Sequence, residues 1–334
     1  MDMAIAQIKD FTHHIDQWIE MAITKRSQNP DIGSSHFVIQ REIYSDGNLY
    51  YQFPSLFSNQ EIGSSIKCLS LKGCSFRSLD SKGYCSLIDL RLKKVFIVKD
   101  TIKIKINAEN LTTFLYAGKP VEFMPINVPK LSNVIIRPML EYSSHALLYA
   151  LGKLSSDIPQ MESLMLSVAP IEEKKLPKQL ALFANLKKLV LLVRTCGETL
   201  RGFIPLLRSS PYLQRLELHL SVRKSERIKE GLMERPSDFP HFHLEEIILS
   251  GFSGCSHDIE FAAYLLSNVE NLKRLTIYSR RLYYEMIPAT LTRESQERVE
   301  ALAAEVTCKD KKTEKGAWEQ LENLVRPGVE LLLA

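Results

Sequence analysis

The sequence IKCLSLKGCSF (residues 66–76) is followed 21 residues later by a second block of the same pattern, LIDLRLKKVFI (residues 87–97). In both blocks an apolar residue or cysteine stands at the first, fourth, sixth, ninth and eleventh positions. Residues two apart on a strand share a face, so the fourth and sixth side chains point the same way. One such coil cannot bury its apolar side alone. The pattern therefore predicts a stack of similar coils.

The same frame, which is that of the leucine-rich repeat, continues along the chain. The distances between successive starts are 21, 24, 20, 30, 25, 27, 31 and 28 residues, so we expect about nine turns, of which the later ones are longer. The longer turns leave room for convex-side helices, which we expect at residues 144–154, 199–208 and 258–267. The later blocks begin at Leu111, Leu131, Met161, Leu186, Leu213, Leu244 and Leu272.

These patterns predict an α/β fold, an irregular and curved leucine-rich-repeat solenoid with parallel strands on its concave face and loops and short helices on its convex face. We expect the solenoid over residues 34–282, with an irregular first strand at 37–44. Apolar residues at three- and four-residue steps predict a helix over 2–25, within a helical cap or linker at 1–33. The frame stops after Leu282, so we expect residues 283–334 to form a helical cap or tail.

Composition limits the class of protein. The chain has 334 residues, 45% of them apolar and 25% charged, which is ordinary for a globular protein. Its 43 basic and 39 acidic residues are nearly balanced, so charge does not predict binding to nucleic acid or membrane. There is no apolar leader and no apolar run of 18 residues. Six scattered cysteines without a C-x-x-C pair favour a reduced intracellular protein, expected in the cytoplasm, the nucleus or both.

Motifs for catalysis and for cofactors are weak. The sequence has no G-x-S-x-G elbow, phosphate-binding loop or dinucleotide glycine fingerprint, although the members of a Ser-His-Asp triad cannot be recognised from sequence alone. His13 and His14 are interpreted as solvated or partly packed side chains, residues 238–243 as a loop rather than a metal site, and Cys74 as structural. We expect no catalytic residue, cofactor or metal.

The fifth and seventh repeat positions point away from the core and indicate what the concave face carries. They predict a basic N-terminal end, an apolar middle and a mixed C-terminal end. A continuous apolar track on exposed strands favours a protein partner, whereas an inward bend or a crossing loop would cover it. The residues expected at a protein-binding surface are Arg91, Leu115, Ile135, Arg137, Met165, Val190, Leu192, Glu217, Ile248 and Tyr278.

Four stretches resemble plant F-box/leucine-rich-repeat proteins with an FBD-type C-terminal region. The resemblance spans roughly residues 10–280, with the FBD-like part at about 240–282, and implies the substrate-recognition subunit of a cullin-type ubiquitin ligase. In that family the repeats hold the target and the F-box docks a SKP-type adaptor. The stretches are HIDQWI (14–19), YQFPSLF (51–57), NLTTFLYAG (110–118) and the ordered set HLEEI (243–247), GFSG (251–254) and YLL (264–266).

Two departures from the family bear on function. The segment that follows the F-box in the family begins near residue 10, so we expect no F-box in this sequence and a SKP-type adaptor as partner only if a longer isoform supplies one. Residues 98–106 stand where the family has a further repeat. The alternatives are therefore a truncated relative that acts as a competitor, a repeat scaffold without ligase coupling, or a small-ligand sensor.

Overall fold

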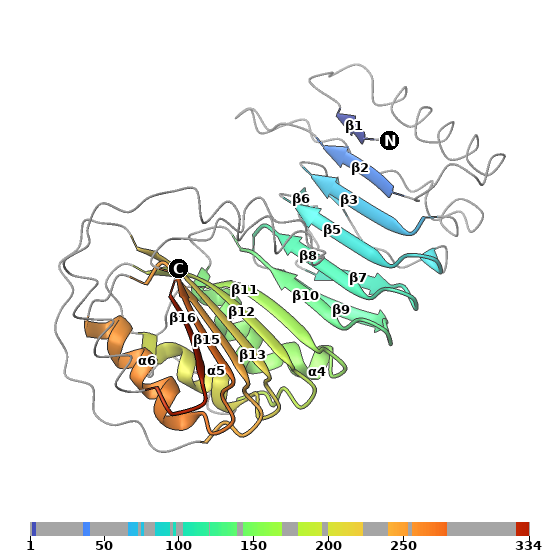
Figure 1. The fold of residues 1–334 in the computed structure, drawn as a ribbon. Coiled ribbons are helices and arrows are strands. Elements are labelled where there is room, and N and C mark those ends of the chain that lie inside the picture. Colours follow the sequence, from blue (N-terminus) through green and yellow to red (C-terminus); the bar gives the residue numbers. More distant parts are fainter. Residues whose placement is uncertain are drawn as a thin grey trace, which may run out of the picture. The chain divides into compact units, whose positions relative to one another are not determined.

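The computed structural model describes residues 2–4, 36–40, 66–72, 75–76, 84–93, 96–97, 103–119, 121–138, 143–168, 180–195, 200–222, 240–252, 256–278 and 325–333. The chain divides into two compact units, an N-terminal unit (Met1–Tyr142) and a C-terminal unit (Ser143–Ala334). Figure 1 shows the strands and helices of the two units.

The main sheet of the N-terminal unit consists of parallel strands that follow one another in chain order. Its register matches the repeat frame, because Leu69 lies opposite Leu90, Leu90 opposite Phe114, and Phe114 opposite Val134. Phe37 lies opposite Leu69, which confirms a strand near the start of the expected range 37–44. The strands are β1 (Asp2–Ala4), β2 (His36–Gln40), β3 (Cys68–Lys72), β5 (Asp89–Lys93), β8 (Thr113–Ala117) and β10 (Asn133–Ile136).

Short strands, rather than helices, form the second layer of the N-terminal unit in the part that the structure describes. β4 (Ser75–Phe76) pairs with β6 (Phe96–Ile97), and β7 (Lys103–Asn107) pairs with β9 (Glu122–Asn127). The ring of Phe123 in β9 packs edge-on against the inward-facing rings of Phe114 and Tyr116, with centroid distances of 5.0 and 5.3 Å. Turns of 20–24 residues leave too little chain for a helix, and an extended segment covers the core instead.

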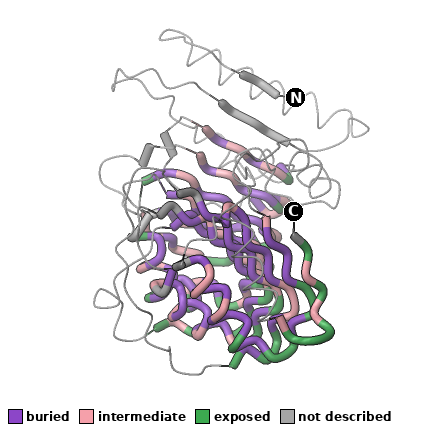
Figure 2. The backbone as a smooth tube through the Cα atoms, turned by 60° about the vertical axis from the view of Figure 1, so that its left-hand side comes forward, coloured by how far each residue is buried: buried purple, intermediate pink, exposed green. Residues whose placement is uncertain are grey.

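The main sheet of the C-terminal unit is also parallel and in chain order, and it keeps the same register. Leu164, Leu189, Leu216, Ile247 and Leu275 lie in one row across the sheet, and all are buried, as Figure 2 shows along these strands. The strands are β11 (Ser163–Val168), β12 (Lys188–Thr195), β13 (Arg215–Val222), β14 (Glu246–Ser250), β15 (Arg274–Tyr278) and β16 (Glu330–Leu333).

Helices connect the strands of the C-terminal unit at the three places where the longer turns predict them, and they lie along one side of the sheet (Figure 1). Their apolar side chains, such as Leu147, Phe203 and Leu265, are buried. None of the described helices is long and apolar enough to cross a bilayer. The helices are α3 (Ser143–Tyr149), η4 (Ala150–Leu154), α4 (Ser155–Asp157), η6 (Leu200–Phe203), α5 (Ile204–Arg208) and α6 (Ser256–Asn268).

Both chain ends differ from the expected helical caps where the structure describes them. Asp2–Ala4, expected to be helical, is strand β1, which pairs with β2. Glu330–Leu333, expected in a helical tail, is strand β16, which pairs with β15. In both places a parallel strand satisfies the backbone groups of a sheet edge, which a helix cannot do. The expected helical parts at 5–33 and 283–324 lie outside the described residues.

Asparagine side chains connect successive turns just before the strands. The asparagine that precedes the first apolar position donates its side-chain N–H to a carbonyl of the preceding turn, and this recurs three times among the described residues. The bonds run from Asn110 to the Cys85 carbonyl (2.6 Å), from Asn185 to the Pro159 carbonyl (2.9 Å) and from Asn271 to the Phe242 carbonyl (2.6 Å). The repeats thus position their strands with side-chain as well as backbone bonds.

Candidate functional site

The outer face of each main sheet carries the third, fifth and seventh repeat positions, which alternate with the buried fourth and sixth positions. Of the ten predicted binding residues, Arg91, Leu115, Ile135 and Arg137 belong to the N-terminal unit and the other six to the C-terminal unit. Strand register aligns them in rows within each unit. Arg91, Leu115 and Ile135 form one row, and Met165, Val190, Glu217 and Ile248 form another. Leu192 and Tyr278 both belong to the next row of the C-terminal unit.

The predicted residues differ in how far they are exposed. Arg91, Arg137, Met165, Leu192 and Tyr278 are half-buried. The other five are buried: Leu115, Ile135, Val190, Glu217 and Ile248 have exposed fractions of 5, 7, 1, 1 and 9%. The apolar track is therefore less open than its pattern predicts, and its accessible part is confined to Met165 and Leu192.

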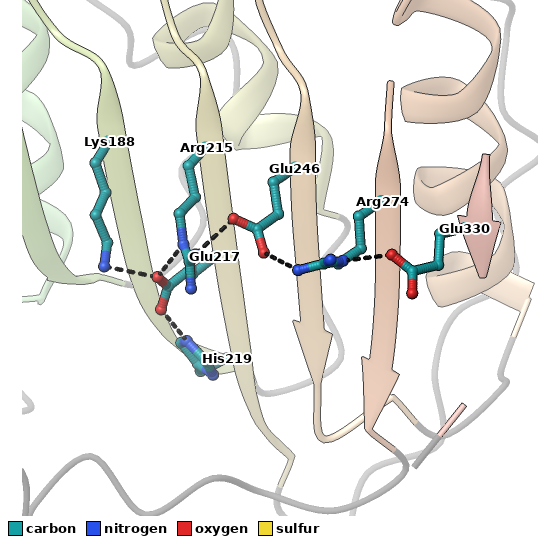
Figure 3. A network of polar contacts seen from close by, with 7 residues as sticks. All are labelled: Lys188, Arg215, Glu217, His219, Glu246, Arg274 and Glu330. Carbon is teal, nitrogen blue, oxygen red and sulfur yellow. Dashed lines mark hydrogen bonds and ion pairs between the residues drawn. The ribbon is translucent and has the colours of Figure 1, made fainter. Parts of the chain in front are cut away.

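The third repeat positions of the C-terminal unit form a row of charged side chains across five strands (Figure 3). Arg215 Nη1 lies 2.5 Å from Glu246 Oε2, and Arg274 Nε lies 2.8 Å from Glu330 Oε2. Opposite charges on neighbouring strands stabilise a sheet, whereas like charges directly opposite each other destabilise it. In strand order the row is Lys188, Arg215, Glu246, Arg274 and Glu330.

In that row Lys188 and Arg215 are like charges that lie directly opposite each other. The carboxylate of Glu217 offsets their repulsion. Glu217 stands two residues beyond Arg215 on the same face. Its Oε1 lies 2.8 Å from Lys188 Nζ and 2.8 Å from Arg215 Nε. Burial alone would raise the pKa of Glu217, but the contact with His219 and the charges of Lys188 and Arg215 outweigh it and hold the pKa well below its usual range. Glu217 is therefore a buried, ionised carboxylate.

His219 extends this network to the next row. Its Nδ1 lies 2.6 Å from Ser250 Oγ, and its Nε2 lies 3.5 Å from Glu217 Oε2. Burial lowers the pKa of His219 more than the neighbouring carboxylate raises it, so the imidazole is neutral. The order Ser250, His219, Glu217 is that of a catalytic triad, but Ser250 has an exposed fraction of 0%. A substrate carbonyl cannot reach its Oγ in this arrangement, and the contacts tie β13 to β14.

The outer face of the N-terminal unit is basic, as the sequence predicts. Arg91 binds both carboxylate oxygens of Asp89, with Nη2 2.6 Å from Oδ2 and Nε 3.1 Å from Oδ1. Lys72 lies directly opposite Lys93 on the neighbouring strand. Burial, and then the charges of Arg91, Arg137 and Lys72, lower the pKa of Lys93. Four cationic side chains thus act on one another at this face.

The residues considered as metal ligands or catalytic groups have structural roles wherever the structure describes them. The described ranges hold no group of three or more His, Cys, Asp or Glu residues that could bind a metal ion. His241 is buried and its backbone pairs with Val269, while Phe242 is exposed, as expected for a loop. His13, His14, Cys74 and Asp238 lie outside the described residues.

Sequence reasoning found Glu217 but missed most of its partners. Lys188 and Arg215 stand at the third repeat position, which lies on the same face as the fifth and seventh positions. The signal was present, since the third positions from Lys188 onward carry charges in every later repeat.

The parallel strands, the buried repeat frame and the outer face define a leucine-rich-repeat domain, a class that suggests protein interaction. A family model described as At1g61320/AtMIF1, LRR domain, matches residues 1–104 and 100–308, and the chain belongs to this family. No curated protein and no solved structure matches the chain.

Proposed function

We propose that the protein is a non-catalytic binding module, an irregular leucine-rich-repeat solenoid that binds a target protein on its concave face. It serves as the substrate-recognition part of an F-box-type ubiquitin ligase in the cytoplasm, the nucleus or both. The family match supports the repeat domain. The ligase role is supported by the four stretches that resemble F-box/leucine-rich-repeat proteins.

The observation that carries the proposal is the alignment of the outer-face residues in the C-terminal unit. Met165 and Leu192, both partly accessible, lie on neighbouring strands, one and two rows beyond the charged row that begins at Lys188. Apolar side chains bordered by fixed charges are typical of a protein interface. Burying what remains exposed of the two side chains would contribute about 1–3 kcal/mol to a complex.

A pull-down from native tissue tests the target-binding face. We expect a discrete partner to be recovered with the wild-type chain and lost with Met165→Asp. Leu182→Asp is the matched control, because Leu182 is 62% exposed and lies before β12 rather than on the sheet face. Equal thermal unfolding of the two variants excludes a folding defect. If every protein recovered with the wild type is also recovered with Met165→Asp, Met165 is not part of the binding surface.

Ligase coupling has a separate test. Co-purification of a SKP-type adaptor with the natural full-length gene product, followed by ubiquitin transfer to the captured target, would support the ligase role. A captured target without any adaptor would contradict the ligase role and leave a repeat scaffold or competitor as the function.

A further inference from the structure

The outer faces of the two units differ in how their charges are compensated. In the C-terminal unit each cation of the charged row is matched by a carboxylate of the same face. In the N-terminal unit Asp89 is the only acidic residue that the described part of β3, β5, β8 and β10 carries on the outer face, and Arg91 holds it. Among the described residues, no carboxylate forms an ion pair with Lys72 or Lys93.

We propose that the outer face of the N-terminal unit binds an acidic segment of a partner protein, whose Asp or Glu carboxylates lie against Lys72 and Lys93. The proposal rests on the proposed protein-binding function and gives the chemistry of the partner. It concerns residues other than Met165 and Leu192, so this proposal and the proposed protein-binding face of the C-terminal unit can fail separately.

Strand register sets the geometry of this face. Lys72 lies opposite Lys93, and Lys93 lies opposite Ala117. The backbone N–H of Arg137 donates to the Tyr116 carbonyl at 2.8 Å, which places Arg137 beside Ala117. Neighbouring strands are about 4.8 Å apart, so the row from Lys72 to Arg137 is about 14 Å long. Small Ala117 leaves space between the cations of Lys93 and Arg137.

The charges at this face repel one another in the absence of a ligand. The lowered pKa of half-buried Lys93 reflects burial first and then the three neighbouring cations. A carboxylate placed against Lys93 would offset both effects, because it replaces lost hydration and opposes the neighbouring charges. The charge of Asp89 raises the pKa of Lys93 but does not outweigh burial and the three cations, and both of its carboxylate oxygens are bound by Arg91.

The size of the face favours a peptide segment over nucleic acid. An extended peptide spans about 14 Å with about four residues, and its alternate side chains, about 6.8 Å apart, point to one side. Two or three carboxylates therefore fit the row. A nucleic-acid site needs a broad basic field, whereas this chain carries 43 basic and 39 acidic residues.

The test is a fluorescence anisotropy titration of the full chain at low salt. The probe is a labelled nine-residue peptide of alternating Ser and Glu, compared with its Ser and Gln counterpart and with single-stranded RNA of nine nucleotides. The variant is Lys72→Gln/Lys93→Gln. The matched control is Lys67→Gln/Lys130→Gln, which removes the same charge from exposed lysines of the same unit. Thermal unfolding confirms that both variants are folded.

We expect the Glu peptide to bind and to lose about tenfold in affinity with Lys72→Gln/Lys93→Gln, and less than about twofold with the control. The Gln peptide should bind at least about tenfold more weakly than the Glu peptide. Equal losses in the two variants, equal binding of the two peptides, or tighter binding of the RNA would each overturn the proposal. A target captured through Met165 together with no peptide binding would overturn this proposal alone.

Discussion

Glu217 has an exposed fraction of 1%, yet it is ionised, because Lys188 of the neighbouring strand and Arg215 and His219 of its own strand surround it. A buried carboxylate costs free energy on leaving water, and only close partners offset that cost. Removing one partner of such a group is therefore more destabilising than removing an exposed ion pair.

Glu217→Gln tests this at residue scale. It leaves Lys188 and Arg215 facing each other without a carboxylate between them. We therefore expect the free energy of unfolding to fall by about 2–4 kcal/mol, a value that is reduced because water screens the two partly exposed cations. Glu162→Gln is the control, since Glu162 makes an exposed ion pair with Lys187 at 2.9 Å, and we expect a loss below about 0.5 kcal/mol. Denaturant titration measures both values, and equal losses would contradict the role given to Glu217.

Two buried histidines predict how stability depends on pH. Burial lowers the pKa of His219 and of His241 from 6.5, so below that pH the unfolded chain binds protons at these sites that the folded chain does not. Stability should therefore fall as the pH falls, by up to about 1.4 kcal/mol per histidine and pH unit. We expect thermal unfolding between about pH 7.5 and 5.5 to show a shallower pH slope in His219→Gln/His241→Gln than in the wild type. The exposed His145→Gln serves as control, and unchanged slopes in the double variant would refute the assignment.

Single elements of this fold depend on bonds between turns as well as on their own apolar residues. Asn185 lies at the surface, but its side-chain N–H holds the Pro159 carbonyl of the preceding turn. Replacing Asn185 by alanine leaves the Pro159 carbonyl with water as its hydrogen-bond partner and loosens the segment that leads into β12.

Asn185→Ala is accordingly expected to lower the free energy of unfolding by about 1 kcal/mol. Glu270→Ala, at the exposed position just before Asn271 in a later turn of the same unit, should change it by less than about 0.5 kcal/mol. Chemical denaturation of both variants measures the difference. A loss at Glu270 as large as that at Asn185 would show that the asparagine bond adds nothing specific.

The sequence predicted the elements best where one face is apolar. Leu189 and Leu191 could be assigned to the core because apolar residues alternate along a strand with one buried face. β16 was missed because Gly328 stands three residues before Leu331, where the preceding repeat has Leu272 before Leu275, and its φ of 93° marks a turn rather than a buried apolar position. The short strands β4 and β6 were missed because two residues carry too little pattern to predict a strand.

The candidate site was only partly predictable, since exposure depends on what packs above a strand. Val190 and Met165 have equivalent positions and similar hydrophobicity, yet Val190 has an exposed fraction of 1% and Met165 is half-buried. The spacing of a repeat places a residue on a face. It does not determine how much of that residue a partner can contact.

At the scale of the whole molecule, one repeat frame supports two units with different surfaces. The N-terminal unit combines short turns, a second layer of strands and a basic face, whereas the C-terminal unit combines longer turns, helices and a charged row in which each cation contacts a carboxylate. Both belong to the At1g61320/AtMIF1 leucine-rich-repeat family, whose model spans them. We infer that the family frame supplies the scaffold and that the third, fifth and seventh repeat positions determine what each unit contacts.

Site-specific photo-cross-linking in native extracts tests the central claim, protein binding through the outer face, most directly. A photoreactive amino acid replaces Met165 or Leu192 on the face, or Leu182 away from it, one position at a time. We predict that positions 165 and 192 form covalent products with the same discrete protein and that position 182 does not. Products formed at position 182 alone, or at none of the three positions, would contradict the account.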